Sequence, residues 1–167
     1  EQPGFLDNKQ FNAGIVQLHD TGLVYDILIY AHQLQEAIGF VDKYPAQSFV
    51  LDHIAKPDIR HGGFDAWAKS FRELAQRPHV TCKLSGMVTE TDWKRWSSAE
   101  LQPYFEVALE AFGSQRLMIG TDWPVLTVGC TYRTWWDTVE QWTNRLTPQE
   151  RDMILGENAM RIYRLRC

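Results

Sequence analysis

Chemically active side chains cluster near the ends of four apolar segments of this sequence. The segments are LVYDILIY, SFVLDH, HVTCKLSG and RLMIGTD. If they form neighbouring parallel strands, the groups at their carboxyl ends meet at one edge of a sheet, where the reactive groups of α/β proteins gather. The side chains concerned are Tyr30, His32, His53, Lys83, Ser85 and Asp122. Their convergence, rather than any single residue, predicts a site.

Asp122 and His53 carry the side chains best suited to hydrolysis. The carboxylate of Asp122 could activate water as a general base or bind a metal ion. The imidazole of His53 could donate a hydrogen bond to a substrate carbonyl or act as a metal ligand. The alternatives are structural: Asp122 caps the turn before Pro124, and His53 is a buried histidine paired with backbone groups. The sequence leaves these alternatives open.

Asp52 and His53 are neighbours, so in a strand their side chains would point to opposite faces. We expect His53 to point into the barrel, and Val50 and Asp52 to face outward together. Lys83 and Ser85 share one face of their strand and could bind an anionic or hydroxylated substrate. The alternative for Lys83 is a surface or ion-paired lysine.

Three aromatic residues are expected to border the same pocket. Tyr30 is the last residue of its apolar segment, and Trp123 follows Asp122 and could wall the pocket. His32 could line the pocket or cap a helix that begins at Gln33.

The sequence lacks the common local metal and nucleophile motifs. It contains no HxH or HExxH pair and no GxSxG nucleophile elbow. A catalytic zinc usually has three protein ligands, so one histidine and one aspartate do not complete such a site. Asp122 and His53 are therefore candidate members of a metal site rather than a whole one.

Strand-like and helix-like segments alternate along the chain. The four apolar segments predict strands at residues 23–30, 48–53, 79–86 and 116–122. Apolar residues at helical spacing predict helices over 33–43, 64–75, 101–112 and 132–146, with another helix before the first strand. Thr147, Pro148 and Glu150 form a capping-box pattern for a last helix, which Gly156 is expected to end.

This alternation predicts an α/β fold with a parallel sheet covered by helices. Four βα units are half of a (β/α)8 TIM barrel, which typically needs ~250 residues. The alternative is an open doubly wound sheet, but the first strand is not followed by the glycine-rich turn of nucleotide-binding folds. We therefore expect one domain over residues 1–167: the C-terminal half of a barrel, four βα units and a C-terminal helix, lacking the N-terminal strands.

Composition narrows the class of protein. The net charge is −4 and the pI is about 5.7, which argues against a nucleic-acid surface. No apolar run reaches the ~18 residues of a membrane span. The three cysteines, Cys82, Cys130 and Cys167, are odd in number and show no CxxC spacing, which favours a reducing compartment. We expect a cytoplasmic protein that binds neither nucleic acid nor membrane.

Four motifs in this order resemble the amidohydrolase superfamily, and more closely its sugar-lactonase branch of L-fuconolactonase-like and 2-pyrone-4,6-dicarboxylate lactonase-like enzymes. They are FVLDHIAKP, CKLSGM, LMIGTDWPV and GENAMRIYRL. The resemblance implies a (β/α)8 barrel of which this chain is the last four strands. It implies that Asp122, after strand eight, activates the hydrolytic water, and that His53, after strand six, polarises the substrate carbonyl. The HxH pair that the family carries after strand one is absent here.

The resemblance implies a hydrolase that opens a sugar lactone or related cyclic ester. Some members of this branch work without a metal, so it implies either one divalent metal such as zinc or none. Two alternatives stay open: a metal-dependent decarboxylase or amidase of the same superfamily, and a non-catalytic half-barrel interaction module. Because a half barrel leaves strand edges open, we expect self-association or pairing with a missing N-terminal half, and no activity of the isolated chain.

Overall fold

The computed structural model describes residues 4–165 and contains one parallel sheet. Its strand order is β1-β2-β3-β4, so strands that follow one another in the chain also lie side by side. The strands are β1 (Tyr25–Ile27), β2 (Phe49–Leu51), β3 (Val80–Leu84) and β4 (Leu117–Ile119). This sequential parallel order is that of a (β/α)8 barrel and differs from the order of a doubly wound sheet, in which the direction of winding reverses.

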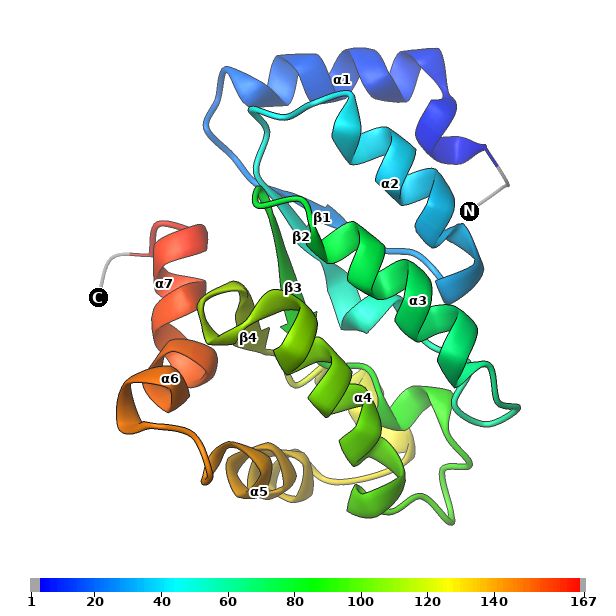
Figure 1. Ribbon diagram of the computed structural model, residues 1–167, viewed down its shortest axis with the longest axis vertical. Coiled ribbons are helices and arrows are strands. Elements are labelled where there is room, and N and C mark those ends of the chain that lie inside the picture. Colours follow the sequence, from blue (N-terminus) through cyan, green and yellow to red (C-terminus); the bar gives the residue numbers. More distant parts are fainter. Residues whose placement is uncertain (1–3, 166–167) are drawn as a thin grey trace.

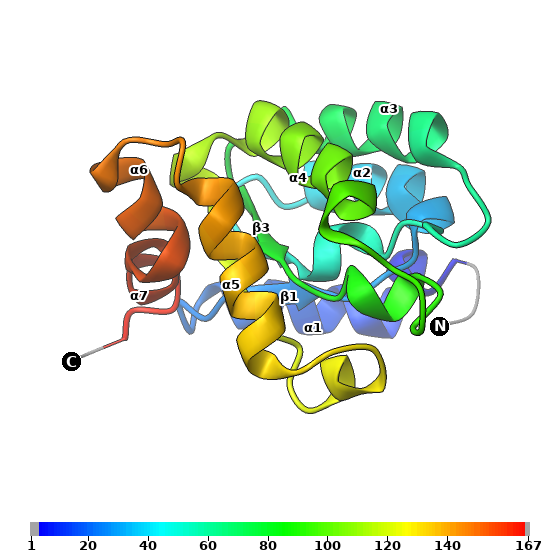
Figure 2. The same cartoon turned by 90° about the horizontal axis from the view of Figure 1, so that it is seen from below.

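Helices follow one another in an arc around the sheet, and the last two lie beyond β4 (Figures 1 and 2). The α-helices are α1 (Lys9–His19), α2 (Leu34–Asp42), α3 (Phe64–Ala75), α4 (Ser98–Phe112), α5 (Tyr132–Thr143), α6 (Pro148–Asp152) and α7 (Asn158–Ile162). Short 3-10 turns follow the strands, among them η3 (Asp52–Ala55) and η4 (Val88–Glu90). Within residues 4–165, no helix is both long and apolar enough to cross a membrane.

The strands are shorter than their apolar segments predict. The pairing of β1 with β2 extends only from Tyr25 opposite Phe49 to Ile27 opposite Leu51. Because Asp52 already belongs to a 3-10 turn, the second strand offers no further partner to the first. Burial of residues beyond the ladder, such as Ile29, explains why the apolar pattern continues past the strand.

Local sequence signals predict the start of the last helix correctly but not its end. The capping box of Thr147 and Glu150 forms as predicted at the start of α6. Gly156 does not end the helical segment, which continues as a π-helical turn, Met153–Glu157, into α7. Asn158 explains this continuation, because its side-chain amide donates to the carbonyls of Ser114 and Leu117 and anchors the segment beside β4.

The two faces of the sheet differ in character. On the face toward the helices, the rings of Tyr25 and Phe49 pack against Phe40 of α2 and belong to one apolar core. Asp26 and Lys83 alternate with these core positions and therefore lie on the opposite, inner face. The inner face thus carries charge, while the helix-facing side supplies the hydrophobic core.

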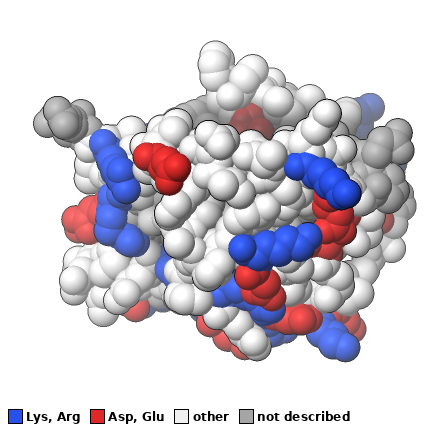
Figure 3. Space-filling model, turned by 90° about the horizontal axis from the view of Figure 1, so that it is seen from above, with Lys and Arg blue, Asp and Glu red and all other residues white. Residues whose placement is uncertain are grey.

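Charge on the outside of the molecule is mixed in sign. On the face seen in Figure 3, basic and acidic side chains lie next to one another rather than in a patch of one sign. One exposed pair is Lys43 with Asp7, and another is Arg77 with Asp42.

Candidate active site

The structure brings His53 and Asp122 together at the carboxyl ends of the strands. Nε2 of His53 lies 3.8 Å from Oδ1 of Asp122, and each side chain is 17% exposed. The two residues come from the turns that follow β2 and β4, which lie two strand positions apart in the sheet. A small molecule can therefore reach both groups from solvent, at the end of the sheet where the sequence predicts a site.

Both residues have left-handed backbone conformations, which are unfavourable for side chains other than glycine. The φ angle is 54° at His53 and 55° at Asp122, and Ile54, Ala55 and Lys56 also have positive φ. Such conformations cost of order 1–3 kcal/mol each and cluster at functional sites. The surrounding packing holds the turn: the buried indole N–H of Trp67 donates to the carbonyl of Ile54.

The turn after β4 is stabilised by groups other than the Asp122 side chain. The backbone N–H of Trp123 donates to Oγ1 of Thr121, and the indole of Trp135 donates to the carbonyl of Gly120. Within residues 4–165, the Asp122 carboxylate forms no hydrogen bond to protein groups. The structural alternative, an aspartate that caps this turn, therefore does not describe its role.

The side chain of Ser85 forms a hydrogen bond with the imidazole of His53. Its Nδ1 lies 2.8 Å from Oγ of Ser85, at the end of β3. Burial lowers the pKa of His53, and the negative charges of Asp122 and Asp52 oppose this effect only in part. The imidazole is therefore predominantly neutral at neutral pH. Gly86 leaves room for the ring, because a Cβ there would lie 2.6 Å from Cβ of His53.

The expected orientation of Asp52 is wrong. Oδ1 of Asp52 lies 2.8 Å from Nζ of Lys83, so the carboxylate faces the inner side rather than the helices. Alternation itself holds: Val50 pairs with Asp26 of the inner face, so both Val50 and Asp52 lie on that face, and the expectation that they face outward together assigned them to the wrong side. β2 ends at Leu51, and the left-handed turn after it then sets the direction of His53.

Lys83 occupies an ion-pair network. Nζ lies 2.6 Å from Asp26 and 2.8 Å from Asp52, and it also stands over the ring of Tyr163. Burial would lower the pKa of Lys83, but its hydrogen bonds to Asp26 and Asp52 outweigh burial and raise that pKa. These contacts are intramolecular, and substrate binding by Lys83 stays a prediction. This is the ion-paired alternative considered for Lys83.

Ser85 is a neighbour of His53. Its side chain is buried, with a residue exposure of 1%, and its hydroxyl contacts His53. The prediction that Ser85 binds substrate stays a prediction.

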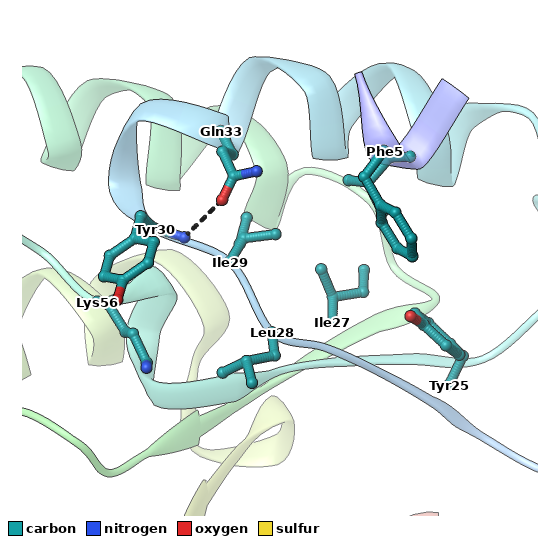
Figure 4. A pocket seen from close by; sticks show the side chains of 9 residues that line it. Phe5, Tyr25, Ile27, Leu28, Ile29, Tyr30, Gln33 and Lys56 are labelled. Carbon is teal, nitrogen blue, oxygen red and sulfur yellow. Dashed lines mark hydrogen bonds between the residues drawn. The ribbon is translucent and has the colours of Figure 1, made fainter. Parts of the chain in front are cut away.

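Tyr30 and His32 lie beside two neighbouring cavities. Their rings stack with centroids 6.0 Å apart, and both line a cavity of about 520 Å³ together with Lys56 and Glu90. Tyr30 and Lys56 also line a second cavity of about 270 Å³, shown in Figure 4. His32 does not cap the helix: Gln33 is the N-cap residue of α2, and none of the described side chains caps that end with a hydrogen bond.

Trp123 projects outward, with 66% of its surface exposed, and it is absent from the lining of both cavities. Its proximity to Asp122 in the chain still places it beside the candidate site. Whether it contacts substrate stays a prediction.

Three residues of the site region were not singled out from sequence. Asp26 is embedded in the apolar run LVYDILIY, and its position there as a lone charge was the available signal. Tyr163 reaches Asp26 from the C-terminal end of the chain, which no local pattern shows. Glu90, whose pKa is raised by burial, lines the larger cavity from the η4 turn.

His53 and Asp122 carry atom types that bind divalent metals, but two ligands are fewer than a metal site usually has. His53 and Asp122 offer an imidazole nitrogen and a carboxylate oxygen, both of which bind zinc. Within residues 4–165, no group of three or more His, Cys, Asp or Glu side chains is arranged to hold a metal ion. These two residues therefore make a partial site.

Comparison with known proteins shows the family. Residues 3–165 match the amidohydrolase family. The chain belongs to this family. It is 39% identical over 171 residues to a protein named L-fucono-1,5-lactonase from Burkholderia multivorans, with 96% of the chain and 58% of that protein covered. A protein of the same name from Burkholderia ambifaria is 36% identical, with 96% of the chain and 57% of that protein covered.

Solved structures confirm the fold. A crystal structure of an amidohydrolase from Burkholderia multivorans with bound zinc superimposes with a TM-score of 0.93 at 38% identity, covering 98% of this chain and 60% of that one. The chain therefore spans a little over half the length of the relatives that it matches. Its sheet and helices are part of a TIM-barrel amidohydrolase fold, as the sequence predicts, and its relatives are lactonase-type hydrolases.

Proposed function

We propose that this chain carries the part of a lactonase active site that activates water and polarises the scissile carbonyl. The observation that carries the proposal is the 3.8 Å approach of His53 Nε2 to Asp122 Oδ1 at the carboxyl ends of the strands. The substrate proposed is a sugar lactone, as the names of the relatives suggest. Resemblance over little more than half of those proteins supports this proposal without deciding the substrate.

In the proposed reaction, Asp122 accepts a proton from water as that water attacks the lactone carbonyl carbon. The N–H of His53 donates a hydrogen bond to the carbonyl oxygen, on which negative charge develops. The bond between the carbonyl carbon and the ring oxygen then breaks, and the ring oxygen takes up the proton that Asp122 accepted, which restores the carboxylate. The product is an open-chain hydroxy acid, in which one water has been added.

The cavity of about 520 Å³ is suited to recognising a polar ring, although neither His53 nor Asp122 lines it. Tyr30 offers an aromatic face there, and His32 and Glu90 offer hydrogen-bonding groups. Such a combination suits a hydroxylated substrate, because hydroxyls both donate and accept hydrogen bonds. We retain Tyr30, His32 and Trp123 as proposed substrate contacts.

A divalent metal such as zinc would be held by His53 and Asp122, with further ligands from outside the described residues. Such an ion would act as a Lewis acid that polarises the carbonyl and lowers the pKa of bound water. Hydrolysis without a metal remains the other form of the proposal, and the general-base role of Asp122 applies to it directly.

A chimeric enzyme tests the proposed function. The chain would replace the matching segment of the Burkholderia multivorans L-fucono-1,5-lactonase, and acid release from L-fucono-1,5-lactone would be measured. We expect the folded chimera to hydrolyse the lactone and the chain alone to show no activity. A folded chimera that leaves L-fucono-1,5-lactone and other sugar lactones intact would contradict the proposal.

Decarboxylase chemistry lacks comparable support. The similar decarboxylase structures are 16–17% identical to this chain and so speak for the fold alone. An assay of the same chimera for carbon dioxide release from aromatic carboxylates would detect that activity. A non-catalytic module predicts that neither assay responds and that Asp122→Asn changes nothing.

We also propose that the open edge of β1 is covered by strands from a second copy or by strands outside the described residues. In the described sheet, β1 pairs only with β2. Leu23, Leu28 and Tyr30 are exposed along and beyond this strand, and the smaller cavity lies beside it (Figure 4). Unpaired strand edges with apolar side chains favour pairing with another chain.

Two free cysteines, Cys82 and Cys130, suit the proposed cytoplasmic location.

A further inference from the structure

We infer that Ser85 is a positioning residue that holds His53 in the tautomer with its proton on Nε2, so that this N–H points toward Asp122. The inference concerns which ring nitrogen carries the proton. It rests on the proposed function only in the role given to the Nε2–H, which is to polarise a substrate carbonyl. Its basis is the geometry on either side of the imidazole.

The contact with Ser85 favours a hydrogen bond that the serine hydroxyl donates to Nδ1 over one that Nδ1–H donates to the serine. Nδ1 lies 2.8 Å from Oγ of Ser85, and within residues 4–165 His53 is the hydrogen-bond partner that this hydroxyl has. If Nδ1–H donated to Oγ, the hydroxyl hydrogen of Ser85 would be buried without an acceptor, which is costly. If the hydroxyl donates to Nδ1 instead, every buried donor is satisfied.

The Asp122 side of the ring favours the same arrangement. Nε2 lies 3.8 Å from a carboxylate oxygen, which attracts an N–H and repels a nitrogen lone pair. With the proton on Nε2, the ring presents a donor to Asp122 and to a carbonyl oxygen placed beside it. Both neighbours of the imidazole therefore select one tautomer, and this is the tautomer that the proposed carbonyl polarisation needs.

Two glycines show that this arrangement is closely enclosed. A Cβ at Gly120 would lie 3.0 Å from Cβ and 3.1 Å from Oγ of Ser85, and a Cβ at Gly86 would lie 2.9 Å from Nδ1 of His53. The serine thus has little freedom to turn to another partner. A hydroxyl can also accept a hydrogen bond, so a metal bound at Nε2 would require the proton to move to Nδ1 and Ser85 to reverse its role.

Nitrogen NMR of the 167-residue chain measures the tautomer directly. The ring nitrogens of His53 would be assigned by the loss of their signals in His53→Asn, at a pH above the ordinary range of histidine. We expect Nε2 to show the chemical shift of a protonated nitrogen and Nδ1 that of an unprotonated acceptor. Dominance of the Nδ1-protonated form, or equal populations of the two, would overturn the inference without any assay of lactone hydrolysis.

Variants then separate positioning from general stability. Ser85→Ala removes the donor, and we expect the two nitrogen shifts to move toward their average; Ser85→Cys, a weaker donor of similar size, gives an intermediate shift. Thr91→Val is the matched control, because it removes an equally buried hydroxyl that donates to the Val88 carbonyl instead. Unchanged His53 shifts in folded Ser85→Ala would show that Ser85 does not set the tautomer.

In an active chimera, Ser85→Ala should lower turnover by about 10–100-fold, as with other orienting partners of active-site histidines.

Discussion

The hydroxyl of Tyr163 lies 2.8 and 2.9 Å from the two carboxylate oxygens of Asp26, joining residues 137 positions apart in the chain. The same carboxylate contacts Lys83, which also pairs with Asp52, the residue before His53. The C-terminal segment is thereby tied to the first strand and to the turn that carries the candidate catalytic histidine. The following predictions test this network, the site and the open edge separately.

Lys83→Met should destabilise the fold, because it leaves Asp26 and Asp52 beside each other without their cation. Removing one partner of a buried pair costs ~3–5 kcal/mol, and partial solvent contact of these groups should limit the loss to about 3 kcal/mol. Urea unfolding measures the change. Lys43→Met is the control, since it breaks an exposed pair with Asp7 and should have a smaller effect. Equal losses in the two variants would contradict the role of the network.

The Tyr163 network should make stability depend on pH in the alkaline range. Burial raises the pKa of Tyr163 from 10.0 to about 12, so the folded state holds the phenolic proton more tightly than the unfolded state does. This contribution to stability is complete below the unfolded pKa and is lost as the pH rises through the folded pKa. Tyr163→Phe should remove it.

Ultraviolet absorbance of tyrosinate measures the ionisation of Tyr163. Burial also raises the pKa of Tyr104, so we expect more than one late-ionising tyrosine. The part due to Tyr163 should disappear in Tyr163→Phe and persist in Tyr132→Phe, which alters an exposed tyrosine. Simultaneous ionisation of all tyrosines in the folded chain would count against the prediction.

Asp122→Asn should abolish catalysis in the active chimera without unfolding it. Loss of a general base typically lowers turnover by ~10²–10⁴. A structural cap would instead cost about 1 kcal/mol of stability and leave turnover nearly intact. Turnover and thermal unfolding should be measured on the same preparation. Asp137→Asn, which breaks the ion pair with Arg133 on α5, is the control and should retain activity.

Gly86→Ala should disturb His53, because the added Cβ would lie 2.6 Å from Cβ of His53 and Gly86 has a φ of 67°. The left-handed backbone alone costs ~1–2 kcal/mol for a non-glycine residue. Gly39→Ala is the opposite case: it lies in α2 with open space around it and should stabilise the fold by up to ~1 kcal/mol. Denaturant unfolding of both variants checks this difference in sign.

The chain should self-associate in dilute solution through the open edge of β1. Light scattering should show a dimer or a larger species, because Leu28 and its neighbours expose apolar surface beside an unpaired strand. Leu28→Lys should shift the population toward monomer. Val16→Lys, at a residue 54% exposed against 53% for Leu28, lies on α1 and should leave association unchanged. A monomeric wild-type chain would contradict pairing between copies at this edge.

Local signals in the sequence determined the elements and their order. The helical stripe at 64–75 coincides with α3, and the Thr147 capping box begins α6 as predicted. These features are local, since they depend on side-chain periodicity and on hydrogen bonds within one turn. The alternation of strands and helices then restricted the topology to parallel sheets, and the strand ends indicated Asp122 and His53 as neighbours.

Tertiary structure decided the roles of the polar residues around that pair. Lys83 and Asp52 became ion-pair partners because the strand register places both on the inner face beside Asp26. Ser85 became a partner of His53 because a left-handed turn, supported by packing from outside the segment, directs the imidazole over the end of β3. Strand alternation predicts which residues share a face but not which face is the inner one, and ion pairs between residues far apart in the chain leave no local pattern. The sequence by itself therefore determined which groups lie at this end of the sheet, and only the fold decided which of them pair with each other.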